Sequence, residues 1–254
     1  MKKVISVWKP VGMTPLGAVK RFKEKNPIHN NKTVSYAGRL DPMAEGIMLL
    51  LIGEENKKRK EYEVLKKTYE TEIVLGITTD SFDALGVIQR VSLPLKINEK
   101  EITSCLGRFV GRQLQLYPPY SSKPFAGKPL FWWARQERLP EIEIPQKEIE
   151  IYDCALLEMT QLPGNALATD AMGRIKKING DFRQDKIIIG WKKFGKKYTT
   201  DNFIKIKLQI ECSSGTYIRQ LAEDVGKKLG CGAFAISIKR IAVGNYTISN
   251  CVEL

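Results

Sequence analysis

The feature that most constrains the fold is an uninterrupted apolar run at residues 47–52, which follows a glycine-rich turn. A run of this length, ending at a glycine, predicts a strand buried on both faces of a sheet. Asp41 precedes the run and is followed by Pro42, which favours an extended or turn conformation at Asp41. Gly38 and Gly46 allow the backbone to bend closely on either side. On its own, an Asp-Pro pair is most often only a turn former.

The charge balance indicates a polyanionic partner. The chain has 254 residues, with 41 Lys and Arg against 28 Asp and Glu, which gives a net charge of +13. A charge of this size favours nucleic acid as a partner, although basic proteins of other kinds exist. Residues 57–67 and residues 170–197 contain most of the excess positive charge. The first of these is most simply a solvated basic surface.

The second basic segment, residues 170–197, also contains Phe182, Trp191 and Phe194. Basic residues interleaved with aromatic ones can follow a phosphate backbone and stack on bases. The same stretch can equally be an insertion, at about residues 163–200, that makes no contact with RNA. The sequence leaves both interpretations open.

Cysteine usage and hydropathy indicate a single cytoplasmic domain over residues 1–254, with its cysteines reduced. The five cysteines are scattered and lack C-x-x-C spacing, which argues against a disulfide framework and against a zinc site. No stretch reaches transmembrane length, and the first apolar run is too short for a signal peptide. We find no internal repeat and no Pro/Ser-rich linker, and we expect no membrane contact.

Periodicity predicts the main helices and strands. Alternating apolar residues predict half-buried strands at 68–75 and 204–212, and a further strand is predicted at 235–241. Helical spacing predicts a helix that Thr14 caps, one that opens at residue 98 or 99, and one that follows Gly215. This mixture favours one α+β domain built on a largely antiparallel mixed sheet.

Two polar loops contain candidates for other sites. His29 lies in the loop at 26–32, where no second His or Cys accompanies it, so we expect a surface histidine and no metal ligand. Asp80 and Asp83 lie in the loop at 78–86. Carboxylates at this spacing can bind a metal ion, but the other ligands of a hard-cation site are missing nearby. We expect a structural loop and no metal.

Residues 38–46 read GRLDPMAEG and fit the pattern G-x-L-D-P-x-A-x-G. This segment resembles the catalytic motif of the TruB family, the bacterial tRNA pseudouridine(55) synthases. Five further blocks resemble that family in the same order, at residues 9–14, 67–69, 79–86, 118–136 and 215–241. Together the blocks span most of the chain.

The resemblance implies the pseudouridine synthase fold, which is α+β with a largely antiparallel mixed sheet, flanking helices and a catalytic cleft. It implies isomerisation of uridine to pseudouridine, with uridine 55 in the T loop of tRNA as the expected target. The partner is then tRNA. No cofactor, metal or protein partner is implied, and a monomer is expected.

The resemblance also implies roles for individual residues. Asp41 is the catalytic carboxylate, Tyr69 stacks on the target base, and Arg219 pairs with Asp41. From the residues alone, Tyr69 would be core packing and Arg219 would be a solvated helix residue. The position of Arg219 at a helix start just after a glycine turn also suits a role in lining a cleft. The remaining candidates for substrate binding are Tyr36, Arg39, Lys67, Tyr120, Lys123 and Ile238, the last as apolar cover over the base.

The sequence departs from the family pattern in three places. Tyr36 stands where TruB members commonly carry histidine, which leaves the exact RNA and uridine open. The spacer residue before Tyr120 is missing, and the C-terminal PUA domain of many relatives is not expected here. Two alternatives therefore stand beside tRNA modification: a synthase for a different RNA, and a noncatalytic RNA-binding or tRNA-folding protein with the same fold. Retention of Asp41, Tyr69 and Arg219 together favours an enzyme.

Overall fold

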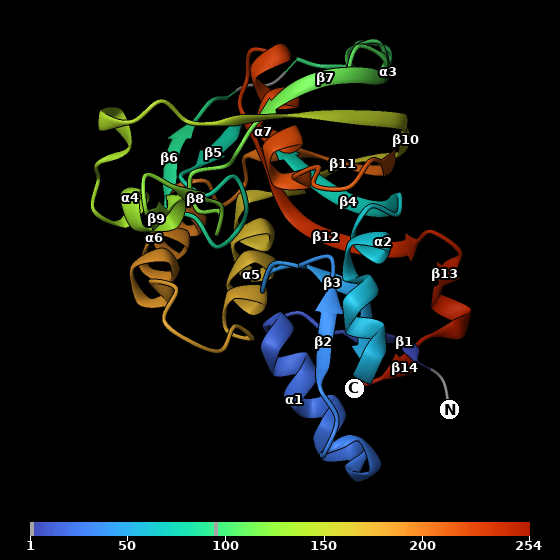
Figure 1. The fold of residues 1–254 in the computed structure, drawn as a ribbon. Helices are drawn as coiled ribbons and strands as arrows, with labels where there is room; N and C mark the ends of the chain where they lie inside the picture. The colour runs from blue at the N-terminus through green and yellow to red at the C-terminus, as the bar shows by residue number, and fades with distance from the viewer. Residues whose placement is uncertain (1–2, 94–95) are drawn as a thin grey trace.

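The computed structural model describes residues 3–93 and 96–254. Its central element is a ten-stranded mixed sheet (Figure 1). Its main path runs in the order β14 (Val252–Glu253), β1 (Val4–Lys9), β3 (Glu45–Ile52), β12 (Ala233–Val243), β4 (Lys67–Leu75), β11 (Asn202–Cys212), β10 (Gln146–Pro163) and β7 (Gly111–Leu116). The strands β2 (Val34–Ala37) and β13 (Tyr246–Thr247) pair with β3 and β12. Only β1 with β14 and β3 with β12 pair in parallel among these strands. The predicted α+β class with a largely antiparallel mixed sheet is confirmed.

The remaining elements flank this sheet. Two small hairpins lie outside it, formed by β5 (Ile77–Thr79) with β6 (Ile88–Val91) and by β8 (Pro124–Phe125) with β9 (Lys128–Pro129). The α-helices are α1 (Pro15–Lys25), α2 (Arg59–Glu63), α3 (Glu99–Gly107), α4 (Leu130–Arg135), α5 (Gly164–Ile175), α6 (Gln184–Lys197) and α7 (Ile218–Lys228). The 3₁₀ turns are η1 (Pro27–His29), η2 (Gly53–Lys58), η3 (Leu139–Glu141) and η4 (Ile248–Asn250).

Strand β3 is buried on both faces, as the apolar run predicts. Met48, Leu50 and Ile52 pack with α1 on one face. Ile47 and Leu49, together with Leu51, pack with Val243 on the other. The strand therefore anchors the loop that carries Asp41 from both sides.

Two helical layers cover the other strands of the sheet. Helices α3 and α7 pack on one face of β4 and β11, and α5 and α6 pack on the opposite face (Figure 1). The predicted alternation is confirmed, because Ile73 of β4 faces the first layer while Val74 faces the second. The cap predicted at Thr14 and the helix start predicted at residue 98 or 99 are also confirmed. Thr14 accepts a hydrogen bond from the Gly17 amide, and Asn98 forms a capping box with Glu101.

The basic segment 170–197 lies in this second layer, and two of its three aromatic side chains are buried. Trp191 is fully buried against Phe194 and Phe234, and Phe182 packs against the same core. The interpretation of Trp191 and Phe194 as base-stacking residues is therefore wrong, whereas Phe182 is only partly buried and lines a cavity. The spacing of Trp191 and Phe194 matches one face of helix α6, so these two side chains face the sheet while the lysines between them face solvent.

Two further expectations concern His29 and the cysteines. His29 is buried, because η1 folds its ring onto Phe22 of α1 at a centroid distance of 5.4 Å. The expectation of a surface histidine is therefore wrong. All five cysteines are free and four of them are buried, as expected for reduced core residues.

No helix in 3–93 or 96–254 is long and apolar enough to span a membrane. Within the same ranges, no group of three His, Cys, Asp or Glu side chains is arranged to hold a metal ion.

Strand β12 approaches β3 so closely at Gly46 that the position has no room for a side chain. A Cβ atom there would lie 2.2 Å from the Arg240 carbonyl oxygen, and φ is +121°. We expect Gly46→Ala to lower the free energy of unfolding by about 2–6 kcal/mol, from backbone strain and overpacking of about 1–3 kcal/mol each. Urea denaturation measures this change.

Gly53 provides the matched control. It also has a positive φ, +62°, but nothing lies within 4 Å of its Cβ position. Gly53→Ala should therefore cost only the left-handed backbone, about 1–2 kcal/mol. Equal losses in the two variants would show that the close approach of β12 to Gly46 contributes nothing.

Candidate active site

The loop between β2 and β3 carries Asp41 and is held at its start by Arg240 of β12. The Arg240 guanidinium is buried. It donates hydrogen bonds to the carbonyls of Gly38 at 3.0 Å, Arg39 at 3.2 Å and Ile47 at 2.7 Å. Gly38 and Arg39 lie in the loop, which has no strand partner, so Arg240 supplies the donors that their carbonyls need, while Ile47 lies in β3.

Lys9, at the end of β1, holds the other end of the loop. Its ammonium donates to the carbonyls of Ala44 at 2.6 Å, Met13 at 2.8 Å and Pro10 at 3.0 Å. Burial lowers the pKa of Lys9 to about 8, so the group still carries its charge at neutral pH. Two buried cations from distant strands therefore bracket Asp41.

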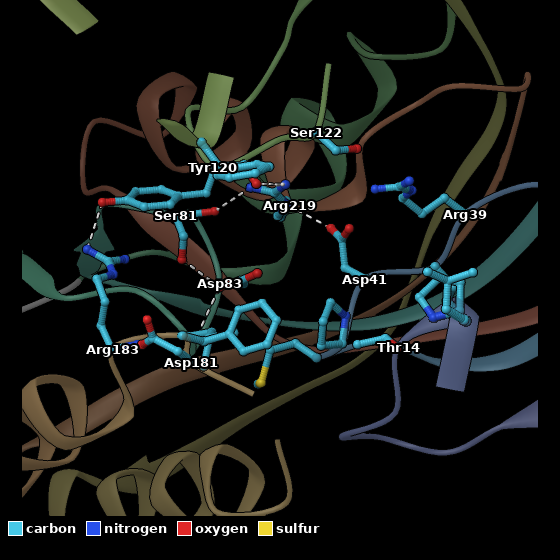
Figure 2. A pocket seen from close by; sticks show the side chains of 18 of the residues that line it. Thr14, Arg39, Asp41, Ser81, Asp83, Tyr120, Ser122, Asp181, Arg183 and Arg219 are labelled. Atoms are coloured by element: carbon cyan, nitrogen blue, oxygen red, sulfur yellow. Dashed lines mark hydrogen bonds and ion pairs between the residues drawn. The ribbon is translucent and has the colours of Figure 1, made fainter. Parts of the chain in front are cut away.

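Arg219, on the first turn of α7, pairs with Asp41 (Figure 2). Its Nε lies 3.0 Å from Oδ2 of Asp41. The other two nitrogens donate to main-chain carbonyls, Nη1 to Ser81 at 3.1 Å and Nη2 to Tyr120 at 3.2 Å. The Arg219 side chain is 4% exposed and that of Asp41 is 34% exposed. The arginine is therefore fixed inside the protein while the carboxylate faces open space.

A second carboxylate, Asp83, lies near this pair. Burial raises the pKa of Asp83 to about 6, against the opposing effects of Arg219 and of a hydrogen bond from Ser81. For Arg219, burial acts to lower the pKa, but the charges of Asp41 and Asp83 outweigh it and the pKa is raised. Arg219 thus remains a cation between two acids. The loop at 78–86, expected to be only structural, contributes to the site.

Asp41 and Arg219 lie in a wall shared by two cavities. The larger, of about 640 Å³, is also lined by Tyr69 and Ile238. The smaller, of about 440 Å³, is also lined by Ser81, Tyr120 and Arg183 (Figure 2). A group entering from either side meets the same carboxylate.

The structure brings the predicted site residues together around these cavities. The larger cavity is lined by Asp41, Tyr69, Arg219, Arg39, Lys67, Lys123 and Ile238. Tyr36 and Tyr120 line the smaller one. The Tyr120 hydroxyl is already engaged, because it lies 3.2 Å from Oδ2 of Asp80 and 2.7 Å from Nη1 of Arg183.

Cations dominate the larger cavity. Burial, together with the neighbouring Arg240, lowers the pKa of Lys67 to about 8. Burial and the neighbouring Lys123 lower the pKa of Lys147. The acids that line this cavity are Asp41 and Glu63. An excess of positive charge in a half-enclosed space favours an anionic ligand such as a phosphodiester.

The sequence interpretation missed four of these contributors: Lys9, Asp83, Lys147 and Arg240. For Arg240 a signal exists, since it follows Ile238 by two positions in a predicted strand and therefore shares its face. For Lys9 and Lys147 there is none. Lys9 binds the distant carbonyl of Ala44 and Lys147 binds the distant carbonyl of Ser214, and periodicity cannot reveal such partners.

Comparison with known proteins identifies the family. The model described as the TruB family pseudouridylate synthase N-terminal domain matches residues 25–171. The tRNA pseudouridine synthase B of Blochmanniella floridana is 31% identical over 246 residues, which cover 97% of this chain and 78% of that protein. The enzyme of the same name from Thermosipho melanesiensis is 29% identical over 253 residues, covering 100% and 67%.

Solved structures show the same fold. A chain of a Cbf5–Nop10–Gar1 complex superposes with a TM-score of 0.61 at 17% identity, covering 99% of this chain and 52% of that one. A chain of an H/ACA RNP bound to a substrate RNA containing 2′-deoxyuridine gives a TM-score of 0.58 at 16% identity, covering 98% and 50%. With the family model matching more than half of the sequence, this chain belongs to the TruB family of tRNA pseudouridine synthases.

Proposed function

We propose that this chain isomerises uridine 55 in the T loop of tRNA to pseudouridine, with Asp41 as the catalytic carboxylate. The observation that carries the proposal is the position of Asp41 in the wall of a basic cavity that Tyr69 and Ile238 also line. Membership of the TruB family supports the reaction. The geometry supports the assignment of residues to its steps.

The reaction rearranges one nucleoside. The bond between N1 of uracil and C1′ of ribose breaks, and a bond between C5 and C1′ forms. The hydrogen on C5 leaves as a proton and N1 gains a proton, so no electrons are exchanged. An enzyme for this reaction needs a carboxylate for a covalent or proton-transfer step, a surface that retains the detached uracil, and access to a base normally stacked in RNA.

Tyr69 and Ile238 suit the binding of the uracil. They belong to adjacent antiparallel strands, β4 and β12, in which Ile238 is paired with Thr71. Both side chains are largely buried and contribute to the lining of the larger cavity. An aromatic ring stacks on a flipped-out base, and an aliphatic side chain covers it with apolar surface. We assign these two roles to Tyr69 and Ile238.

The cations at the cavity suit the RNA backbone. Arg39 and Lys123 are exposed at its rim, and Lys67 lies deeper. Lys67 donates to the carbonyls of Glu63 and Leu65, both at 2.5 Å, so its charge is held in place. We assign Arg39 and Lys123 to phosphate contacts close to the flipped nucleotide.

Tyr36 favours a second candidate, the same reaction on a different RNA. Its ring lines the smaller cavity beside Asp41 and lies 5.5 Å from the Arg59 guanidinium. A tyrosine stacks on a base where the family commonly has histidine, and this change alters the selection of the RNA more than the chemistry. A tRNA transcript in which uridine 55 is replaced by cytidine separates the two candidates. Continued turnover on that transcript would favour a different target.

Asp41→Asn should abolish turnover and leave RNA binding intact. The change keeps the shape of the side chain but removes its charge, and loss of a catalytic nucleophile typically lowers turnover by about 10³-fold or more. Binding should be unchanged or tighter, because a negative charge facing the phosphates is gone. Tritium release from tRNA containing 5-tritiated uridine measures turnover, and filter binding measures affinity. Turnover close to that of the wild type would remove Asp41 from its role.

Arg219→Lys should keep a positive charge but lose the three-way hydrogen bonding. A lysine cannot reach Asp41, the Ser81 carbonyl and the Tyr120 carbonyl in the geometry of the guanidinium fork. We expect kcat to fall by about 10²-fold, the effect of a misplacement of about 1 Å in a reacting group. Single-turnover kinetics at saturating enzyme measures this step. An unchanged rate would mean that charge alone is sufficient at Arg219.

Replacing Arg39 and Lys123 together by Gln should flatten the salt dependence of RNA binding. Each lost phosphate contact removes about 0.7–0.9 from the slope of log K against log salt, so the pair should remove about 1.4–1.8. Lys192 and Lys193 on α6 serve for comparison, since they are exposed and line neither cavity. An equal change after their replacement by Gln would mean that RNA also contacts α6.

A further inference from the structure

Arg183 has two unusual features for a residue outside the catalytic pair. It lies at the N-terminal end of α6 with a left-handed backbone, φ 65°. Its guanidinium binds two residues from distant segments. Nη1 donates to Oδ2 of Asp80 at 2.7 Å and to the Tyr120 hydroxyl at 2.7 Å, and Nη2 lies 3.2 Å from Oδ1 of Asp80.

The two residues that Arg183 binds belong to the segments that hold Arg219, and Figure 2 shows one of these contacts, from Arg183 to Tyr120. One is Tyr120 itself, whose carbonyl accepts from Nη2 of Arg219. The other is Asp80, which precedes Ser81, whose carbonyl accepts from Nη1 of Arg219. Arg183 therefore ties together the two chain segments that fix the plane of the Arg219 guanidinium.

Backbone strain marks the same region. Phe82, which lies between Ser81 and Asp83, also has a left-handed backbone with φ 65°. Non-glycine residues keep such a conformation only where the surrounding contacts enforce it, and these residues cluster at functional sites. The fork from Arg183 to Asp80 supplies one of those contacts, two residues before Phe82.

Direct contact between Arg183 and RNA is the competing explanation, because Arg183 also lines the smaller cavity. The surroundings of the guanidinium weigh against this contact. The guanidinium carbon lies 4.2 Å from the centroid of the Tyr120 ring, so that ring covers one face. The side chain is only 22% exposed, and its charge is paired with Asp80. A phosphate would have to compete with a bidentate carboxylate for the same donors.

We propose that Arg183 is a positioning residue for the reaction. It clamps the Asp80–Ser81 and Tyr120 segments together so that their carbonyls aim Arg219 at Asp41. The kinetic test of this inference rests on the proposed function. The positioning of Arg219 against Asp41 does not depend on that function and can be tested separately.

The kinetic test compares Arg183→Ala with Arg174→Ala. Arg174 of α5 is a matched control, because its side chain is also 22% exposed and is also paired with carboxylates, those of Asp170 and Glu72. Arg183→Ala should lower kcat for tritium release by about 10–100-fold and change KM little, since misaimed groups lose rate rather than affinity. Arg174→Ala should leave both constants near those of the wild type. A rise in KM with kcat unchanged in Arg183→Ala would overturn the inference in favour of RNA contact.

A spectroscopic test follows the hydrogen bond from Arg219 to Asp41 directly and needs no measurement of activity. The Nε–H group of Arg219, which donates to Asp41, should give a distinct signal in a ¹⁵N correlation spectrum that is absent in Arg219→Lys. The signal should shift or broaden in Arg183→Ala and remain in place in Arg174→Ala. An unmoved signal in Arg183→Ala would overturn the inference.

Two further variants keep the test decisive if Arg183→Ala fails to fold. Arg183→Lys retains one charged donor toward Asp80, and Asp80→Asn retains the shape of the acceptor. Both should give kcat values between those of the wild type and Arg219→Lys, together with a shifted Nε–H signal. Wild-type constants and signals in both variants would contradict the clamp.

The two proposals fail in different ways. If Asp41→Asn is inactive and Arg183→Ala behaves like the wild type, the positioning role is wrong and the proposed function stands. If the wild type releases no tritium from any tRNA, the proposed function is wrong, and the Nε–H signal still decides the role of Arg183.

Discussion

The site depends on buried cations whose hydrogen bonds end on main-chain carbonyls. Arg240, Lys9 and Arg219 together donate nine such bonds or ion-pair contacts, eight of them to carbonyl oxygens and one to Asp41. A buried charge is costly unless its donors are satisfied, and an irregular loop is costly unless its acceptors are. Here the loop carbonyls accept hydrogen bonds from the buried cations, so the donors of the cations and the acceptors of the loop are satisfied together. This reciprocity lets a loop without strand pairing hold a carboxylate in a fixed position.

The rest of the fold supplies these cations from rigid elements. Lys9 ends β1, Arg240 lies within β12, and Arg219 opens α7, so each is anchored by a strand or a helix with its own buried side. Asp41 by contrast remains partly open to both cavities. Rigid supports around an accessible carboxylate are what preorganised chemistry requires, because little rearrangement is then needed when substrate arrives.

Much of the fold could be predicted from periodicity, whereas the site could not. The strands at β3, β4 and β11 follow from alternation and apolar runs, since burial on one or both faces leaves a direct trace in the sequence. The burial of Trp191 and Phe194 also follows from their spacing, because residues three positions apart share one face of a helix even among lysines. Arg219 looks like a surface residue from its helix alone. Its burial depends on carbonyls at Ser81 and Tyr120, and no local pattern encodes such long-range partners.

The separation of the partners along the chain has a consequence for folding. Asp41 and Arg219 are 178 positions apart, and the bond from Arg240 to Ile47 spans 193 positions. Contacts between residues so far apart in the sequence can form only after large loops have closed. The entropy cost of closing these loops comes before any stabilisation from the contacts, so folding is slow. During synthesis from the N-terminus, β1 and β2 are made in time to pair with β3, whereas the Asp41 loop must wait for Arg240 of β12. Helix α1 can shield one face of β3 early, but the other face lacks its buried partner Val243 until β12 is made, and it is open to aggregation until then.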